Sequence, residues 1–311
     1  MIENNLLKAR QKIYIKYSEA KLKINTFKKK RVLGEGAQGK VFKYCETDNF
    51  CVAVKKIYID NKTSKFINDI NSKKALKNTV FIELFVNKLI NKILLNNISP
   101  HFVFFYNNNF EERSGVCDDD YPYSSYFYNE YINNNQSFGD WIYKKKSLKL
   151  LYNAFFQITT AIYTAQTQFG LMHLDLHSEN ILVKKIPKGG HFKYIINDIE
   201  YNIPNLGYLF IINDFGYAWI PKNKKKDKEY DIKFILNDIK DLCPAKIIFD
   251  LKYIIKNLKS NKINFEDLIN NIWGDMYKKI PSKSKLLETY YPDKTIKLDH
   301  KIKEIIKNGV N

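Results

Sequence analysis

The sequence predicts an α+β fold in two parts, a β-rich amino-terminal part with one prominent helix and a mainly helical carboxy-terminal part. Residues 31–59 alternate apolar and polar side chains and are rich in strand-forming residues, which predicts three strands joined by two turns. Residues 79–97 carry apolar side chains at dense helical spacing and end in two asparagines, which predicts the prominent helix. Residues 229–310 are mostly helical in pattern. The polar stretch 132–138 separates the two parts, and a cleft between such parts is a usual place for a ligand.

The remaining elements follow from local patterns of the same kind. Residues 1–30 are polar and basic with apolar residues at helical spacing, which predicts a short amino-terminal helix or a partly ordered arm. Residues 60–78 are polar, and we expect a loop that leads into the prominent helix. The other expected elements, in chain order, are strands near 101–106 and 124–132, two helices over 138–170, and strand-like runs between 181 and 213 broken by PKGG and NIPNLG.

The chain is strongly basic. It has 311 residues, of which 45% are hydrophobic, enough for a large core, and its net charge is +18 from 51 basic and 33 acidic residues. Such a charge suggests contact with polyanions, and weak contact of this kind stays open. The basic residues are scattered, however, and no nucleic-acid motif accompanies them. The favoured interpretation is a solvated lysine-rich surface that reflects AT-rich codons.

The cysteines and the apolar runs bear on the compartment. Cys45, Cys51, Cys117 and Cys243 form no CxxC pair, so we expect no zinc knuckle. Cys45 and Cys51 flank a hairpin turn and can face each other, but free thiols in a reducing compartment are the default expectation. The amino terminus lacks the apolar region of a signal peptide, and the longest apolar runs are too short to cross a bilayer. We therefore expect a soluble, monomeric, intracellular protein of the cytoplasm or nucleus.

A glycine-rich stretch, LGEGAQGKV, occupies residues 33–41. A dinucleotide-binding fingerprint requires a helix directly after its glycines, whereas here a strand-like pattern continues. A glycine-rich hairpin lets backbone amides approach phosphates without obstruction by Cβ atoms, although a plain hairpin is the alternative. The residues expected to contact a nucleotide are Leu33, Gly34, Glu35, Gly36, Ala37, Gln38, Gly39, Lys40 and Val41.

The next strand carries VAVK, in which Ala53 and Lys55 share one face. Ala53 would cover an adenine, and Lys55 would point into the cleft at the α- and β-phosphates of a nucleotide. Lys56 is the alternative in register, with a side chain that would face away. Glu83 is the only acid in the helix over 79–95, and it is the best candidate to orient Lys55; a glutamate on the helix surface is the alternative interpretation.

The phrase HLDLHSEN at 173–180 supplies the reactive groups. Asp175 would accept the proton of an attacking hydroxyl. Asn180 would bind Mg²⁺ (or Mn²⁺) together with Asp214 of NDFG, because carboxylate and carboxamide oxygens suit this hard cation. His173 is expected to be structural and to pack the loop against the Asp214 region. Together with the glycine hairpin, the strand lysine and the helix glutamate, these motifs form an ordered set that is specific for phosphoryl transfer.

This ordered set resembles the eukaryotic-type serine/threonine protein kinase superfamily over about residues 30–260, most specifically its haspin-like branch. GEGAQGKVF and HLDLHSENILVKK are similar to the glycine loop and the catalytic loop of that branch, which also has a long insertion between the catalytic loop and the metal-binding motif. Unlike haspin, this chain keeps a conventional DFG at 214–216. The resemblance implies a two-lobed protein-kinase-like fold. Its parts would be a basic extension over 1–28, an N-lobe over 29–132 with one key helix, and a C-lobe over 133–311.

The resemblance also implies roles for single residues. Asp231 would anchor the backbone of the catalytic loop. Glu130 and Ile132 would offer backbone groups to adenine, with Asn129 at the gatekeeper position. His177, two residues after the aspartate, would assist the γ-phosphate where many kinases have a lysine.

Two departures from the family pattern concern regulation. Leu174 replaces the arginine that usually pairs with a phosphorylated activation loop, and no APE motif follows Gly216. Control by activation-loop phosphorylation is therefore not expected.

The resemblance thus implies an ATP- and Mg²⁺-dependent kinase that acts on Ser/Thr hydroxyls of a protein substrate. A small-molecule kinase of the choline or aminoglycoside type and a catalytically weak nucleotide-binding scaffold are the alternatives. The AT-rich composition is compatible with a large DNA virus, in which case a place in the virion is open.

Overall fold

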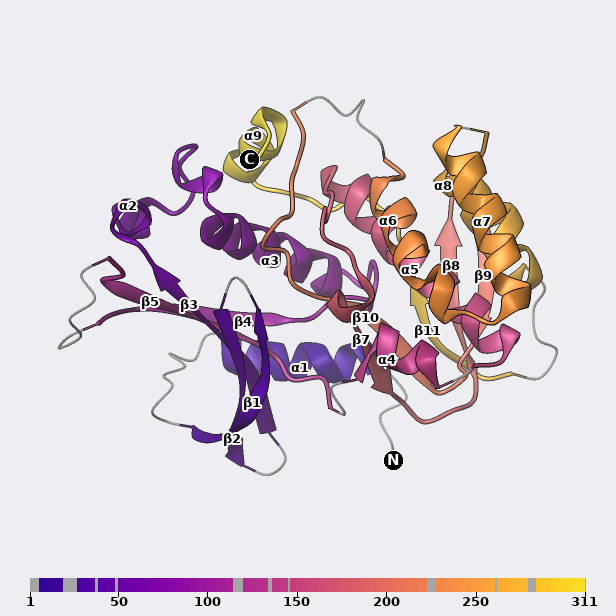
Figure 1. Ribbon diagram of the computed structural model, residues 1–311, viewed down its shortest axis with the longest axis horizontal. Helices are drawn as coiled ribbons and strands as arrows, with labels where there is room; N and C mark the ends of the chain where they lie inside the picture. Colours follow the sequence, from indigo (N-terminus) through magenta and orange to yellow (C-terminus); the bar gives the residue numbers. More distant parts are fainter. Residues whose placement is uncertain are drawn as a thin grey trace.

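The structure is a computed structural model. It describes residues 6–18, 27–36, 39–47, 50–113, 120–133, 136–144, 146–222, 228–260, 262–278 and 284–310. Within these ranges the fold is mixed α+β: one end is built around a five-stranded sheet and the other is mainly helical (Figure 1). The predicted fold class is confirmed at this level.

An antiparallel sheet with the strand order β1-β2-β3-β5-β4 forms the first part. Its strands are β1 Lys28–Gly36, β2 Gly39–Thr47, β3 Phe50–Ile59, β4 Phe105–Glu112 and β5 Tyr123–Glu130. The three strands and two turns predicted over 31–59 are confirmed. The fourth strand begins later than predicted, because residues 99–104 run as an extended connection into it and hydrogen-bond to other parts of the chain.

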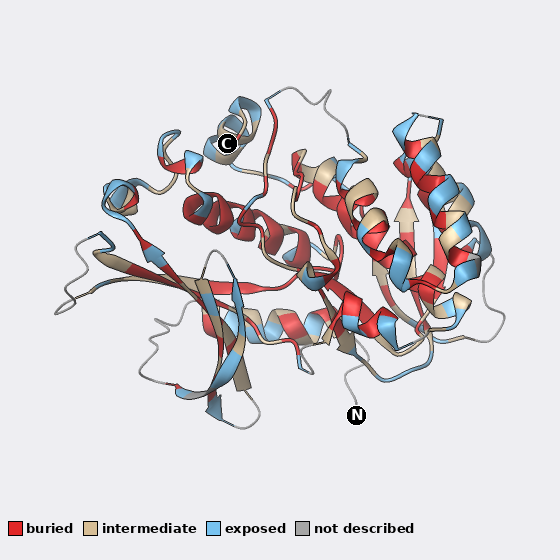
Figure 2. Cartoon of the chain, viewed as in Figure 1, coloured by how far each residue is buried: buried red, intermediate tan, exposed pale blue. Residues whose placement is uncertain are grey.

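Helix α3, Thr79–Leu95, packs against this sheet and is buried along almost its whole length (Figure 2). The prominent helix of the sequence is thus confirmed. Polar side chains on so buried a helix require partners. Asn91 meets this requirement: its Nδ2 donates to the carbonyl oxygen of Phe105 at 2.6 Å, and its Oδ1 accepts from the Phe105 amide at 3.0 Å. One side chain therefore fixes α3 to the start of β4.

The polar stretch ahead of α3 forms short helical turns: α2 Asn61–Ser64 and 3-10 turns at Ile67–Asp69 and Ala75–Lys77. A plain loop was the expectation over 60–78. Asp60 caps α2, because its carboxylate accepts from the Thr63 amide at 2.7 Å.

The second part is mainly helical. The two helices predicted over 138–170 are α4, Phe138–Tyr143, and α5, Leu148–Phe169, and both predictions are confirmed. Ser147 caps the start of α5, and Gly170 ends it at φ 68°, a conformation that favours glycine. The later helical elements are α6 Tyr230–Ile239, α7 Ala245–Lys259, the short α8 Phe265–Asp267 with the π turn Leu268–Trp273, and α9 His300–Asn308.

Two small sheets complete this part, with the orders β10-β7-β6 and β11-β8-β9. Their strands are β6 Gln136–Ser137, β7 Ile181–Lys185, β8 His191–Ile196, β9 Ile199–Pro204, β10 Tyr208–Ile212 and β11 Leu286–Tyr290. β9 overlaps a predicted break, and it forms because Asn197 and Asp198, both at positive φ, make a tight hairpin with β8. β11 lies in a segment predicted to be mostly helical and is made a strand by parallel pairing with β8.

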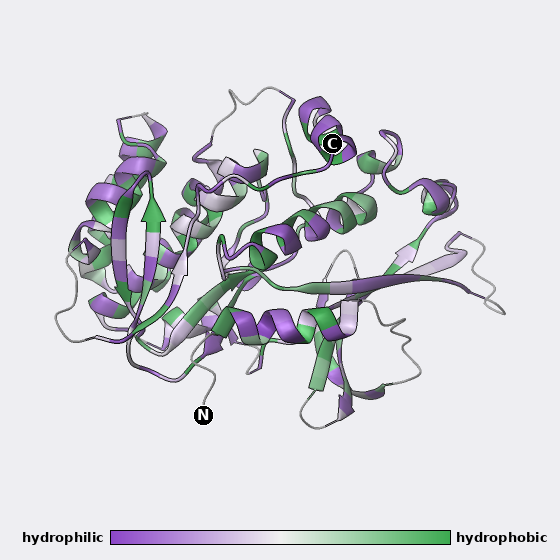
Figure 3. Cartoon of the chain, turned by 180° about the vertical axis from the view of Figure 1, so that it is seen from behind, coloured by the Kyte–Doolittle hydropathy of each residue, from purple (hydrophilic) through white to green (hydrophobic). Residues whose placement is uncertain are grey.

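Helix α1, Leu6–Ser18, lies across the back of the molecule (Figure 3). Of the two expectations for the amino terminus, the helix is the one the structure contains. Leu7, Arg10 and Tyr17 are buried, so the helix packs into the fold. The Tyr17 ring stacks on Phe50 of β3 with centroids 3.6 Å apart.

The cysteines differ from the expectation. Cys45 and Cys51 are directly opposite each other in β2 and β3 and form a disulfide. The default expectation of free thiols was therefore wrong for this pair, because hairpin register brings the two residues together. Cys243 is a buried free thiol, and Cys117 lies outside the described residues. No helix in the described ranges has the length and apolar character needed to cross a bilayer.

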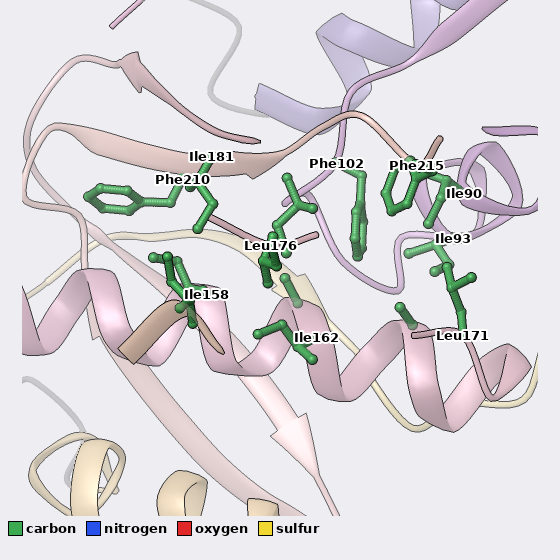
Figure 4. Packing of buried hydrophobic residues seen from close by; sticks show 14 of the residues in the cluster. Ile90, Ile93, Phe102, Ile158, Ile162, Leu171, Leu176, Ile181, Phe210 and Phe215 are labelled. Atoms are coloured by element: carbon green, nitrogen blue, oxygen red, sulfur yellow. The ribbon is translucent and has the colours of Figure 1, made fainter. Parts of the chain in front are cut away.

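The two parts share a core at the connecting segment, residues 99–104. Figure 4 shows Phe102 of this segment beside Phe215, with Ile90 and Ile93 of α3 on one side and Leu176 on the other. His101 is fully buried next to them. Its Nδ1 donates to the Phe210 carbonyl at 2.9 Å, and its Nε2 accepts from the Tyr194 hydroxyl at 2.6 Å. These bonds require the neutral ring, and burial lowers the pKa of His101 from 6.5 to about 3.

We predict that His101 makes the fold sensitive to mild acid. Its pKa is depressed in the folded state, so its contribution is complete above about pH 6.5 and is lost as the pH falls toward 3. Between about pH 6.5 and 5 the free energy of unfolding should fall by about 2 kcal/mol through this group alone. In urea titrations, His101→Gln should remove this part of the pH dependence, whereas His300→Gln, at an exposed position, should retain it. Equal slopes for wild type and His101→Gln would contradict the prediction.

Candidate active site

The glycine-rich hairpin is formed by the ends of β1 and β2, where Gly36 lies opposite Gly39. Gly39 has φ 143°, and a Cβ atom there would lie 2.1 Å from the carbonyl oxygen of Lys56. This position therefore requires glycine for both conformation and space. A Cβ on Gly34 or Gly36 would meet nothing within 4 Å.

The other residues of the hairpin have different surroundings. Leu33 and Val41 are half-buried. Glu35 and Lys40 are exposed and pair with each other at 2.8 Å, so their side chains are directed to solvent. Ala37 and Gln38 lie outside the described residues.

Lys55 lies in β3 with only 6% of its surface exposed. Its Nζ is 2.9 Å from Oε2 of Glu83 and 2.7 Å from Oδ1 of Asp214. The structure thus brings together three predicted residues from β3, from α3 and from the segment after β10. Lys56 faces away, with its Nζ over the rings of Tyr58 and Tyr126, as the register alternative implied.

Burial and charge act against each other in this cluster. Burial raises the pKa of Glu83 to about 7, although the nearby Lys55 lowers it. Burial also opposes ionisation of Lys55 and Asp214. For these two groups the attraction between the opposite charges outweighs the effect of burial, so the pKa of Lys55 is raised and the pKa of Asp214 is lowered. Lys55 therefore stays protonated at neutral pH.

A buried carboxylate holds the backbone at the start of the loop at 173–180. Asp231 of α6 accepts hydrogen bonds from the amides of His173 at 2.8 Å and Leu174 at 2.9 Å. Leu174 has φ 63°, an uncommon conformation for a residue with a side chain. The two bonds to Asp231 hold this turn, as the resemblance implied.

His173 connects the loop to the following motif. Its Nε2 donates to the carbonyl oxygen of Asn213 at 2.9 Å, and its ring lies 5.1 Å from that of Phe215. His173 is buried, and the structure confirms the packing role predicted for it.

Asp175, His177 and Asn180 lie together on the loop at 173–180, and all three are partly exposed. Asn180 donates from Nδ2 to the carbonyl oxygen of Asp175 at 2.8 Å and to Nε2 of His177 at 3.1 Å. The same ring nitrogen is 3.7 Å from Oδ2 of Asp175. The side chains of Asp175 and His177 are 38% and 35% exposed, so both can meet a ligand.

Asn180 and Asp214 present oxygens that fit a magnesium ion. The amide of Asn213 donates to the carbonyl of Asn180 at 2.9 Å, which joins the two segments. The Nδ2 of Asn180 is used within the loop, so its Oδ1 is the atom left for a ligand. Within the described ranges, no three His, Cys, Asp or Glu side chains form a metal cluster.

The residues expected to border adenine lie at the end of β5 and directly after it. Asn129 lies opposite Ala53 in the β3–β5 register. The amide of Glu130 donates to the carbonyl of Phe104 at 2.7 Å. Ile132 is buried in a small cluster with Val103. We refer to residues 129–132 as the hinge segment.

Sequence reasoning missed the side-chain partners of Glu130. Arg10 of α1 and Lys184 of β7 lie 2.7 Å and 3.1 Å from its carboxylate. One signal was available, because arginine is rare in this chain: Arg10 is one of three arginines among 51 basic residues. A lone arginine on a helix with apolar neighbours suggests a buried, directional contact.

The segment after the DFG motif is short and anchored. Trp219 exchanges backbone hydrogen bonds with Met172, both at 2.8 Å. Ile220 pairs with Val310 beyond α9, with bonds of 3.2 and 2.8 Å. Residues 223–227 lie outside the described residues, as does most of the lysine-rich run at 222–228.

Comparison with known proteins gives similarity to viral kinases. No family model matches the chain. It is 25% identical over 230 residues, 70% of its length, to a protein of Invertebrate iridescent virus 6 named probable serine/threonine-protein kinase 380R. Over 72 residues it is 39% identical to putative serine/threonine-protein kinase 019R of Frog virus 3 (isolate Goorha). The chain covers only 41% and 8% of the lengths of these relatives. It is thus similar, over most of its own length, to a part of a larger viral protein that bears a kinase name.

Proposed function

We propose that this protein is an ATP-dependent serine/threonine protein kinase with a two-lobed fold of the haspin-like kind, encoded by a large DNA virus. The observation that carries the proposal is the Lys55 cluster, in which a buried ammonium is oriented by Glu83 at 2.9 Å and Asp214 at 2.7 Å. The viral relatives with kinase names support it independently. In this proposal residues 29–132 form the N-lobe and residues 133–311 the C-lobe.

ATP would lie between the glycine hairpin and the hinge segment. The hairpin backbone over 33–41 would cover the phosphates. Ala53 would pack on the adenine, with backbone groups of Glu130 and Ile132 as hydrogen-bond partners. Lys55 would bind the α- and β-phosphate oxygens, because its charge is held at the inner end of this space.

The transfer step follows from the exposed carboxylate of Asp175. That carboxylate accepts the proton of a Ser or Thr hydroxyl as the hydroxyl oxygen bonds to the γ-phosphorus. The bond from that phosphorus to the β–γ bridging oxygen breaks, and ADP leaves. Asn180 and Asp214 would hold Mg²⁺, which neutralises phosphate charge when bound. His177, whose Nε2 is 3.7 Å from Oδ2 of Asp175, would hydrogen-bond a γ-phosphate oxygen.

The anchoring of residues 217–222 supports activity without activation-loop phosphorylation. Leu174 offers no charge to a phosphate, and the short segment already pairs with Met172 and Val310. These backbone contacts would keep the segment ordered, as a phosphate on the activation loop does in kinases that are switched on by phosphorylation.

We predict that Asp175→Asn lowers the rate of phosphoryl transfer by about 10²–10⁴-fold while ATP still binds, because the proton acceptor is lost and the phosphate contacts remain. Transfer from γ-labelled ATP should be measured on a protein panel and on small alcohols such as choline and aminoglycosides. Glu304→Gln, at an exposed position of α9, is the control and should match wild type. Transfer to small alcohols alone would contradict the choice of protein substrate, and undiminished transfer by Asp175→Asn would contradict the role of Asp175.

A second prediction concerns the buried ion pair. Glu83→Gln should lower kcat/KM for ATP by about 100-fold, because Lys55 would no longer be held at the phosphates. Lys55→Met should have at least as large an effect. Lys56→Met is the matched control, since its side chain lies on the opposite face of the same strand, and it should stay within about twofold of wild type. Similar losses in Lys55→Met and Lys56→Met would show that the strand, rather than the ion pair, matters.

A further inference from the structure

We propose that Arg10 of helix α1 is a positioning residue for nucleotide binding, which fixes the hinge segment and the connecting segment relative to each other. This inference rests on the proposed function, since it concerns the same cleft. The partners of Arg10 are the side chain of Glu130 in the hinge segment and two backbone carbonyls of the connecting segment.

The guanidinium of Arg10 is nearly saturated with hydrogen bonds. Its Nε donates to both carboxylate oxygens of Glu130, at 2.9 and 3.1 Å, and Nη2 donates to Oε2 at 2.7 Å. Nη1 donates to the Pro100 carbonyl at 2.6 Å, and Nη2 also donates to the Phe102 carbonyl. The Arg10 residue is 3% exposed. One side chain thus joins a hinge carboxylate to two carbonyls of the connecting segment.

The connecting segment in turn touches the motif that carries Asp214. The carbonyl of His101 accepts from the amide of Ile212 at 2.8 Å, at the end of β10. The ring of Phe102 lies 6.3 Å from that of Phe215 (Figure 4). A shift of the connecting segment would therefore reach the Lys55 cluster as well as the hinge.

Glu130 is held from three sides. Besides Arg10, its carboxylate accepts from Lys184 of β7 at 3.1 Å, and its backbone amide donates to the Phe104 carbonyl at 2.7 Å. Burial raises the pKa of Glu130, but the charges of Arg10 and Lys184 outweigh it and lower the pKa to about 2. The carboxylate is therefore ionised at neutral pH. Loss of Arg10 would leave it with Lys184 and with the amide of Phe104, which donates to Oε2 at 3.4 Å.

Helix α1 is itself tied to both parts of the molecule. The amide of Leu7 donates to Oε1 of Glu288 in β11 at 2.8 Å. Gln11 donates to the Leu94 carbonyl at 2.7 Å, at the end of α3. Tyr17 donates to Glu46 of β2 at 2.9 Å. These contacts hold helix α1 in place on both sides of Arg10. Arg10 can therefore restrain movement of the hinge segment, which is what a positioning contact requires.

Lysine is a poor substitute for Arg10. Its ammonium can pair with Glu130, but one point charge cannot reach a carboxylate and two separate carbonyls in fixed directions. Arg10→Lys should therefore weaken nucleotide affinity by about threefold and Arg10→Met by about tenfold. The kcat should stay within about twofold, because Arg10 contacts Glu130 of the hinge segment directly but reaches the Lys55 cluster only indirectly, through the connecting segment.

The test compares four full-length variants with wild type. Arg10→Lys and Arg10→Met probe the contact, Ile15→Ala changes the exposed face of the same helix, and Leu251→Ala opens a buried site in α7, far from the cleft. The measurements are the Kd for Mg·ATP, the KM and kcat for ATP, the free energy of unfolding and hydrogen exchange over residues 99–104 and 129–132. The expected result is a raised Kd and KM with faster exchange in both segments for the Arg10 variants alone. Leu251→Ala should lose stability while its KM stays at the wild-type value.

Three results would overturn the inference, and they can be told apart. If wild type binds and uses ATP while the Arg10 variants lose stability with unchanged Kd and KM, Arg10 is only structural and the proposed function stands. If wild type binds no Mg·ATP at all, the proposed function fails and the inference fails with it. A rise of KM in Leu251→Ala equal to that in Arg10→Met would assign the effect to general destabilisation and also overturn the inference.

Discussion

The site depends on one constraint: an ammonium group, that of Lys55, has to remain charged inside the protein. Transfer of an isolated charge out of water is highly unfavourable unless opposite charges and hydrogen bonds surround it. Glu83 and Asp214 provide them, and they come from a helix and from a segment more than a hundred residues further along the chain. Meeting the requirement of this one side chain therefore fixes the relative position of β3, α3 and the segment after β10.

Arg10, Glu130 and Lys184 form a second buried ionic cluster. They come from α1, the hinge segment and β7, so this cluster also joins segments that are distant in the sequence. The connecting segment contacts both clusters. Its carbonyls accept hydrogen bonds from Arg10 and from the amide of Ile212, and its Phe102 packs beside Phe215. The two clusters are thus coupled through backbone hydrogen bonds and aromatic packing, which are rigid and directional. This arrangement connects the Lys55 cluster and the hinge segment to helix α1 through the connecting segment.

Those parts of the fold and the site that depend on local residue patterns could be predicted from the sequence. The hairpin strands, α3 and the pair Lys55–Glu83 follow from residue spacing, because strand and helix periods place those side chains on known faces. β11 was not predictable, since its pairing with β8 is a contact between distant segments and its five residues carry no strong pattern of their own. The role of Arg10 was hidden for the same reason: its partners lie far away in sequence. The disulfide between Cys45 and Cys51 depends on the register of β2 and β3. The turn between these strands suggested that the two cysteines face each other, but it did not determine whether they are bonded.

The pairing of Ile220 with Val310 has a consequence for the order in which the protein can be completed. A ribosome makes the chain from the amino terminus, and residues near 220 emerge long before residue 310 exists. The backbone groups of Ile220 that Val310 satisfies in the finished protein must bond to water until then. The residues of the Lys55 cluster are made before Val310, so that cluster can form earlier than the contact between Ile220 and Val310. Nascent chains that end before α9 would carry the Lys55 cluster together with a segment that lacks its partner in the folded protein.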